Sequence, residues 1–289
     1  MNTLYIRVLS ILLGTTLLVG CATNRHHTEA DIVVSIPPIK YIADEITCHE
    51  LKIDVLLPSG AGPESYELTP RQYISLNKAN IILTTGLIAF EQALIDDIDQ
   101  RDKVVNLSNG INLIEGNCSH AHHEHGHHHH GIDPHIWTSP QELKIMARNA
   151  YEAIMQHYPD STKYSDAYNA LVVRLNKLDT ECRNMCEHTE AKAFVIYHPA
   201  LTYLSRAYNI EQIAVEDEGK EPSAKHIANI IEQAKAKGVK ALLYQIQYPR
   251  SVVDVIAEDL QLDASQIDPM AENVCENIHH ITQIITNNK

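Results

Sequence analysis

The chain has 289 residues, of which 44% are hydrophobic and 21% charged, and its formal net charge is −14 with histidine counted as neutral. This length suits one large domain or two medium ones, and the composition is that of a globular protein rather than a disordered chain. The acidic balance argues against nucleic-acid binding, which depends on clustered Lys and Arg, and suits cationic ligands. The 18 histidines are the compositional exception.

The first twenty residues have the pattern of a targeting segment. Arg7 precedes an apolar run over residues 8–20, which fits a signal peptide and is too short for a permanent membrane helix. The run ends in Leu18-Val19-Gly20-Cys21, a pattern typical of lipoprotein cleavage sites, so we expect diacylation of Cys21. An ordinary signal peptide followed by a chance cysteine is the alternative. We expect an extracytoplasmic protein, in the periplasm or on the cell surface, whose residues 21–30 form a tether and whose lipid is its only membrane contact.

Five cysteines remain beside the predicted lipidation site, and they are Cys48, Cys118, Cys182, Cys186 and Cys275. Five is an odd number, so in an oxidising compartment at least one thiol stays unpaired or binds something. Cys182 and Cys186 are four residues apart on a predicted helix, where a disulfide is geometrically awkward. A zinc site at this pair and simple buried thiols both remain open.

Strands and helices alternate along the first half of the mature chain. The strands are expected at 31–36, 51–57, 81–84 and 103–107, and the helices at 39–47, 69–78 and 90–97. The second of these helices has Thr69 as its N-cap and Pro70 at its first position. This alternation predicts a parallel sheet with helices on both faces.

Two helices are expected in the middle of the chain. Ser139-Pro140-Gln141-Glu142 reads as a capping box that opens a helix to about residue 157, where Tyr158-Pro159 ends it. A second helical stretch starts at Asp160 or Ser161 and continues to about Glu187, with its apolar residues on one face. At 1.5 Å per residue it would reach roughly 40 Å, long enough to serve as a rigid backbone between two lobes.

The second half repeats the alternation of the first. Strands are expected at 193–197, 210–215, 239–244 and 265–268, and helices at 224–237, 250–260 and 273–286. We therefore predict an α/β fold of two (β/α) lobes with mainly parallel sheets. The lobes would be residues 31–139 and 190–289, joined by helices within 140–189 that include the long rigid one.

Four polar residues are predicted at the carboxyl ends of strands, where parallel sheets bind their ligands. They are Glu64, His135, His198 and Asp268. Two imidazoles and two carboxylates form a suitable donor set for zinc or manganese. A single histidine at a strand end is more often a hydrogen-bonded structural residue than a ligand. Four donors at equivalent positions, two from each lobe, favour a shared metal site.

A histidine-rich loop is predicted at residues 119–131, inside the first lobe. Its eight histidines are His120, His122, His123, His125, His127, His128, His129 and His130. Such a tract is a flexible array of imidazoles that can bind zinc, copper or nickel weakly, so we expect auxiliary metal binding there. A purification tag is the alternative, and the internal, interrupted run argues against it.

Several motifs carry a resemblance to a known family. They are Gly60–Pro70, Asp133–Trp137, Tyr197–Ala200, Glu218–Ser223 and Asp268-Pro269. The chain resembles, over residues 31–289, the substrate-binding proteins of zinc and manganese ABC transporters (cluster A-I), and its nearest likeness is the zinc-uptake branch. That branch often carries a His-rich loop before the Asp-Pro-His motif. The resemblance implies two lobes joined by a long helix, with metal bound at their interface.

The resemblance also implies a function without catalysis. It is the extracytoplasmic, high-affinity capture of zinc by a monomer and its delivery to an ABC permease. The family's histidine ligands carry over directly to His135 and His198, whereas Asp268 matches an aspartate that ligates in some members and lies nearby in others. The family usually has histidine where this chain has Glu64. This harder oxygen donor keeps a manganese receptor as an alternative.

Two further alternatives stay open at this point. One is a metal-binding adhesin lipoprotein that recognises a host or matrix protein. The other is a zinc hydrolase with Glu64 or Glu67 as its general base, although the sequence contains neither an HExxH helix nor a nucleophile elbow.

Overall fold

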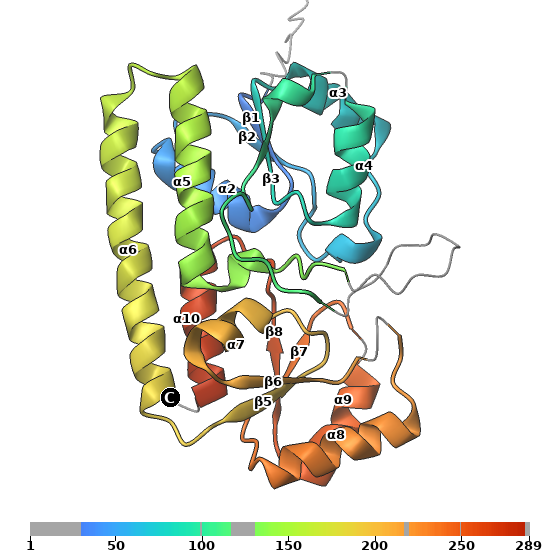
Figure 1. The fold of residues 1–289 in the computed structure, drawn as a ribbon. Coiled ribbons are helices and arrows are strands. Elements are labelled where there is room, and N and C mark those ends of the chain that lie inside the picture. The colour runs from blue at the N-terminus through green and yellow to red at the C-terminus, as the bar shows by residue number, and fades with distance from the viewer. Residues whose placement is uncertain (1–29, 99, 117–130, 217–219, 249, 287–289) are drawn as a thin grey trace, which may run out of the picture.

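The computed structural model describes residues 30–286 apart from residues 99, 117–130, 217–219 and 249. The predicted signal peptide, Cys21, nearly all of the tether, Cys118 and the histidines at 120–130 lie outside the described residues. Two α/β lobes lie one above the other; the long helix α6 runs along one side of both, and α5 lies between α6 and the upper lobe (Figure 1).

The first lobe is built on a four-stranded parallel sheet of order β2-β1-β3-β4. Its strands are β1 (Ile32–Val34), β2 (Ile53–Val55), β3 (Ile81–Thr84) and β4 (Val104–Asn106), and its helices are α2 (Pro37–Ile46), α3 (Pro70–Lys78) and α4 (Ala89–Asp97). All residues of the central strands β1 and β3 are buried. Their continuous apolar runs are what a strand covered by helices on both faces requires.

The second lobe repeats this arrangement, with the order β6-β5-β7-β8 and again only parallel pairs. Its strands are β5 (Ala193–Ile196), β6 (Glu211–Ala214), β7 (Leu242–Gln245) and β8 (Ala264–Ile267), and its helices are α7 (Thr202–Tyr208), α8 (Ala224–Ala236), α9 (Arg250–Leu260) and α10 (Val274–Thr286). A core of its own lies between this sheet and α8 and α9.

Two helices, α5 (Pro140–His157) and α6 (Thr162–Glu187), connect the lobes. The 26-residue α6 packs against α5 and α2 on the side of the first lobe and against α7 and α10 of the second (Figure 1). Buried residues of both lobes, such as Ile32, Phe194 and Leu243, belong to one continuous hydrophobic cluster. The predicted α/β fold with a long linking helix is thus confirmed, and packing along α6 fixes how the lobes sit against each other.

The structure differs from the sequence prediction at two places near this connection. Helix α7 was not predicted. The capping box at Ser139 is only half formed: the Ser139 hydroxyl accepts the N–H of Gln141 at 3.3 Å, but the Glu142 carboxylate accepts a hydrogen bond from Arg206 of α7 at 2.7 Å. A charge-assisted bond to a guanidinium is stronger than one to a backbone N–H, so Glu142 turns towards the second lobe.

The four cysteines among the described residues form no disulfide. Burial raises the pKa of the Cys182 thiol to about 11 and that of Cys186 to about 12, so both stay protonated at neutral pH. Within the described part of the chain no cysteine belongs to a cluster that could hold a metal. Of the two open readings of this pair, the buried thiols therefore fit the structure.

None of the helices in the described part of the chain combines the length and the apolar composition that crossing a bilayer demands.

Candidate functional site

Three of the four predicted donors meet between the two lobes. Nε2 of His135 and Nε2 of His198 lie 3.4 Å apart, and Oε1 of Glu64 lies 3.8 Å from the first and 3.4 Å from the second. Among the described residues, these three form the one group of side chains close enough to share a metal ion. Donors 2.0–2.1 Å from a tetrahedral zinc would be about 3.3–3.4 Å apart, so the triangle is near the size that zinc requires.

Two of the side chains come from loops at the carboxyl ends of strands, and His135 lies just before the turn that leads into α5. Glu64 lies in the 3₁₀ turn Pro63–Ser65, in the loop after β2, and keeps 23% of its side chain exposed. His135 precedes the 3₁₀ turn Ile136–Thr138, which leads into α5, and His198 follows β5; both are almost fully buried. The first lobe thus supplies two donors and the second lobe one.

Each imidazole is oriented by a carboxylate on its far nitrogen. Nδ1 of His135 lies 2.9 Å from Oδ1 of Asp133, which also accepts the backbone N–H of His135. Nδ1 of His198 is hydrogen-bonded to Oε2 of Glu216. A carboxylate partner keeps the hydrogen on Nδ1, so the lone pair of a neutral imidazole lies on Nε2, towards the other donors.

Two side chains from the end of β7 and the loop after it complete the setting of His198. The amide of Gln245 holds the backbone of His198 at both ends, accepting its N–H at 3.2 Å and donating to its C=O at 2.6 Å. The ring of Tyr248 stacks on the imidazole, with centroids 5.4 Å apart. These contacts restrict His198 before any ion binds.

Removing Glu216 tests this arrangement. We expect Glu216→Ala to weaken zinc binding by about 10- to 100-fold, the usual effect of losing a carboxylate that orients a ligand histidine. Competition with a chromogenic chelator would measure the change. The matched control is Glu211→Ala, which removes an exposed carboxylate of β6 that pairs with Lys237 and should leave the affinity unchanged. Equal losses in both variants would contradict an orienting role for Glu216.

Asp268 is not part of the three-residue group. Its Oδ1 accepts the backbone N–H of Met270 at 3.0 Å, and its backbone C=O accepts the Asn277 amide at 2.9 Å. The next two residues, Pro269 and Met270, do line the cavity beside the histidines. Direct ligation by Asp268 therefore stays a prediction, and three protein donors leave one position of a tetrahedral ion for water.

The charges of the site are strongly coupled. Burial lowers the pKa of His135, but the charge and hydrogen bond of Asp133, helped by Glu64, outweigh it and raise the pKa to about 9. Burial likewise raises the pKa of Glu64, but the two imidazoles outweigh it and bring the pKa to about 2. A proton on Nε2 of His135 thus faces Glu64 and His198, the place where a cation would sit.

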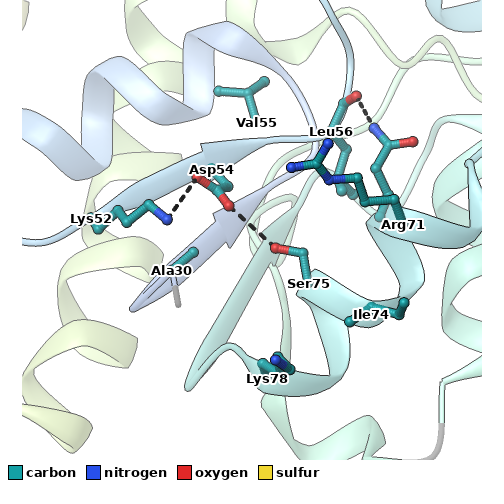
Figure 2. A pocket seen from close by; sticks show the side chains of 10 residues that line it. Ala30, Lys52, Asp54, Val55, Leu56, Arg71, Ile74, Ser75 and Lys78 are labelled. Carbon is teal, nitrogen blue, oxygen red and sulfur yellow. Dashed lines mark hydrogen bonds and ion pairs between the residues drawn. The ribbon is translucent and has the colours of Figure 1, made fainter. Parts of the chain in front are cut away.

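The size of the cavity indicates whether an ion or a larger ligand fits the site. The space lined by Glu64, His135 and His198 has a volume of about 20 Å³, enough for one ion or water molecule. A wider cavity of about 430 Å³ lies between β2 and α3, where the Asp54 carboxylate pairs with Lys52 and accepts from Ser75 (Figure 2). It contains none of the predicted donors. The site between the lobes therefore has room for a cation but not for an organic molecule.

The chain is similar to known proteins in both sequence and fold. Residues 32–288 match the family model described as zinc-uptake complex component A, periplasmic (ZnuA). The chain is 28% identical over 240 residues to the high-affinity zinc uptake system protein ZnuA of Bacillus subtilis, covering 79% of this chain and 75% of that protein. It is also similar to a crystal structure of ZnuA, with a TM-score of 0.80, 28% identity and coverage of 89% and 98%. A zinc-bound deletion mutant of ZnuA gives a TM-score of 0.79 at 28% identity, with coverage of 89% and 97%.

Proposed function

The chain belongs to the family of periplasmic zinc-uptake complex component A proteins, and we propose that it captures zinc outside the cytoplasm and hands it to the permease of an ABC transporter. The observation that carries this proposal is the triangle of the half-buried Glu64 and the buried His135 and His198, with separations of 3.4–3.8 Å between donor atoms from both lobes. The family match and the zinc-uptake relatives favour none of the manganese-receptor, adhesin and hydrolase alternatives.

Capture replaces the water ligands of the ion with protein ligands and involves no catalysed reaction. Hydrated zinc loses water and gains the two Nε2 lone pairs and the Glu64 carboxylate. Glu64 is the most exposed of the three donors, so it is the first that an incoming cation meets. The carboxylates on both Nδ1 atoms hold the imidazoles in place, which reduces the conformational entropy lost on binding.

The donor set decides between zinc and manganese. Two nitrogens and one oxygen favour zinc, because divalent zinc exceeds manganese in affinity for such sites, and softer imidazoles widen the difference. We expect protein purified without chelators to contain at least one equivalent of zinc by elemental analysis. Manganese in an excess on the order of 100-fold should not displace it. Preferential retention of manganese would show that the protein is a manganese receptor instead.

The remaining parts of the proposal rest on the sequence. Lipid attachment at Cys21, auxiliary metal binding by His120–His130 and a monomeric state are supported by the signal-peptide pattern, the histidine content and the family resemblance. Zinc retention by the folded domain does not depend on them. Direct coordination of zinc by Asp268 is a separate proposal, supported by the position of Asp268 directly after β8.

A further inference from the structure

The hydroxyl of Tyr203 joins helix α7 of the second lobe to two chain segments of the first. The Tyr203 side chain is fully buried, accepts the N–H of Ile114 at 3.2 Å and donates to the C=O of Asp133 at 2.8 Å. The two segments also pair directly, since the N–H of Asp133 donates to the C=O of Ile114 at 2.9 Å. The Tyr203 hydroxyl is therefore hydrogen-bonded to both of these paired segments.

Asp133 is also the residue that orients His135. Its Oδ1 accepts from both Nδ1 and the backbone N–H of His135, each at 2.9 Å. The bond from Tyr203 thus ends on the backbone of the residue whose side chain sets the His135 imidazole. Tyr203 itself is the second residue of α7, the helix that follows His198 in the chain. The Tyr203 hydroxyl therefore connects this helix to the backbone of Asp133.

Neighbouring contacts hold Tyr203 in this position. The guanidinium of Arg206 lies 5.0 Å from the centre of the Tyr203 ring, donates to the C=O of Asn112 at 2.6 Å and pairs with Glu142 at 2.7 Å. A second bond crosses in the opposite direction, from the Trp137 indole to the C=O of Pro269 at 2.9 Å. Buried bonds from both lobes therefore flank the histidine pair.

We propose that Tyr203 is a positioning residue that sets the distance between His135 and His198 in the metal-free protein, so that zinc finds both donors in place. This inference rests on the proposed zinc site. Without the hydroxyl, the Asp133 peptide and its carboxylate gain freedom, and zinc binding must restrict them.

The test is Tyr203→Phe, which keeps the ring and its contact with Arg206. We expect zinc affinity to fall about tenfold, because the Asp133 peptide is less restricted in the metal-free variant and zinc binding must then order it. The visible absorption spectrum of bound Co²⁺, which reports ligand geometry, should change as well. The matched control is Tyr208→Phe, which removes a hydroxyl from the same helix, bonded to Asp179 at 3.1 Å. It should leave both the zinc affinity and the Co²⁺ spectrum unchanged.

A second measurement uses the parent protein, in case Tyr203→Phe does not fold. Because coupling between two equilibria is reciprocal, zinc should stabilise the Tyr203 contacts if they favour zinc binding. We expect the Ile114 amide to exchange hydrogen at least about tenfold more slowly with zinc bound. Parental zinc affinity in Tyr203→Phe, an equal loss in Tyr208→Phe, or unchanged exchange at Ile114 would each overturn the inference. A parent protein that binds no zinc would instead overturn the proposed function.

Discussion

Replacing either imidazole of the site, by His135→Ala or His198→Ala, should weaken zinc binding by about 100- to 1000-fold. The binding free energy of a protein zinc site is roughly 10–16 kcal/mol and is shared among its ligands. The loss of one ligand therefore removes about 3–4 kcal/mol of binding free energy. Neither histidine has a substitute, because the only other donor of the described cluster is Glu64. Calorimetric titration of the metal-free variants with zinc would measure the loss.

Two controls separate the site from histidine content in general. Deleting residues 119–130 removes the histidine-rich tract but keeps the bond from the Gly116 N–H to the Gly131 C=O that closes its base. This deletion should change the affinity of the buried site far less than either point substitution does. His280→Ala removes an exposed histidine of α10 and should have no effect. If deleting the tract lowered the zinc affinity more than replacing His135 did, the principal zinc site would not be the one between the lobes.

Local sequence signals predicted the starts of three helices of this fold. Proline at the first helical position marks the starts of α3 at Pro70 and α5 at Pro140. The Ser223 hydroxyl caps α8 by accepting the N–H of His226 at 3.2 Å. Each signal acts within three residues of the helix start, so it can be read without knowledge of the tertiary structure.

Helix α7 shows where such signals are missing. Its N-cap is Leu201, whose side chain has no atom that could accept a backbone N–H, and its seven residues make too short a pattern to recognise. What stabilises it is distant in the sequence: Tyr203 bonds to Asp133, and Arg206 pairs with Glu142. The same pair explains the half-formed capping box at Ser139, since Glu142 binds Arg206 instead of its own helix end.

For the site too, some residues were predicted from the sequence and others were not. Glu64, His135 and His198 were predicted from their positions at strand ends, and the structure brings them together. The carboxylates that orient the histidines were missed. Glu216 follows β6 directly enough that the same strand-end rule would have found it, and Asp133 was quoted only as part of a motif. Their pairing with particular imidazole nitrogens depends on side-chain directions that no spacing in the sequence specifies.

Zinc affinity should rise with pH by about tenfold per unit up to roughly pH 9. The pKa of His135 in the metal-free protein is about 9, so below that pH zinc must displace a proton from the imidazole. Glu64, with a pKa of about 2, is already ionised and releases none. Calorimetric titrations at pH 7.5 in two buffers of different ionisation enthalpy should show the release of about one proton per zinc. Chelator competition between pH 6 and 9 would give the slope.

The same raised pKa predicts the opposite trend for the metal-free fold. Protonated His135 stabilises it fully below the unfolded-state pKa of about 6.5, and this contribution is lost as pH rises through about 9. The melting temperature of the metal-free protein should therefore fall over that range, while the increase caused by zinc grows. Asp133→Asn is the matched variant, because it removes the charge that raises the pKa but keeps an oxygen for Nδ1. It should release fewer protons at pH 7.5 and flatten the slope. An unchanged slope in Asp133→Asn would show that the proton displaced by zinc is not on His135.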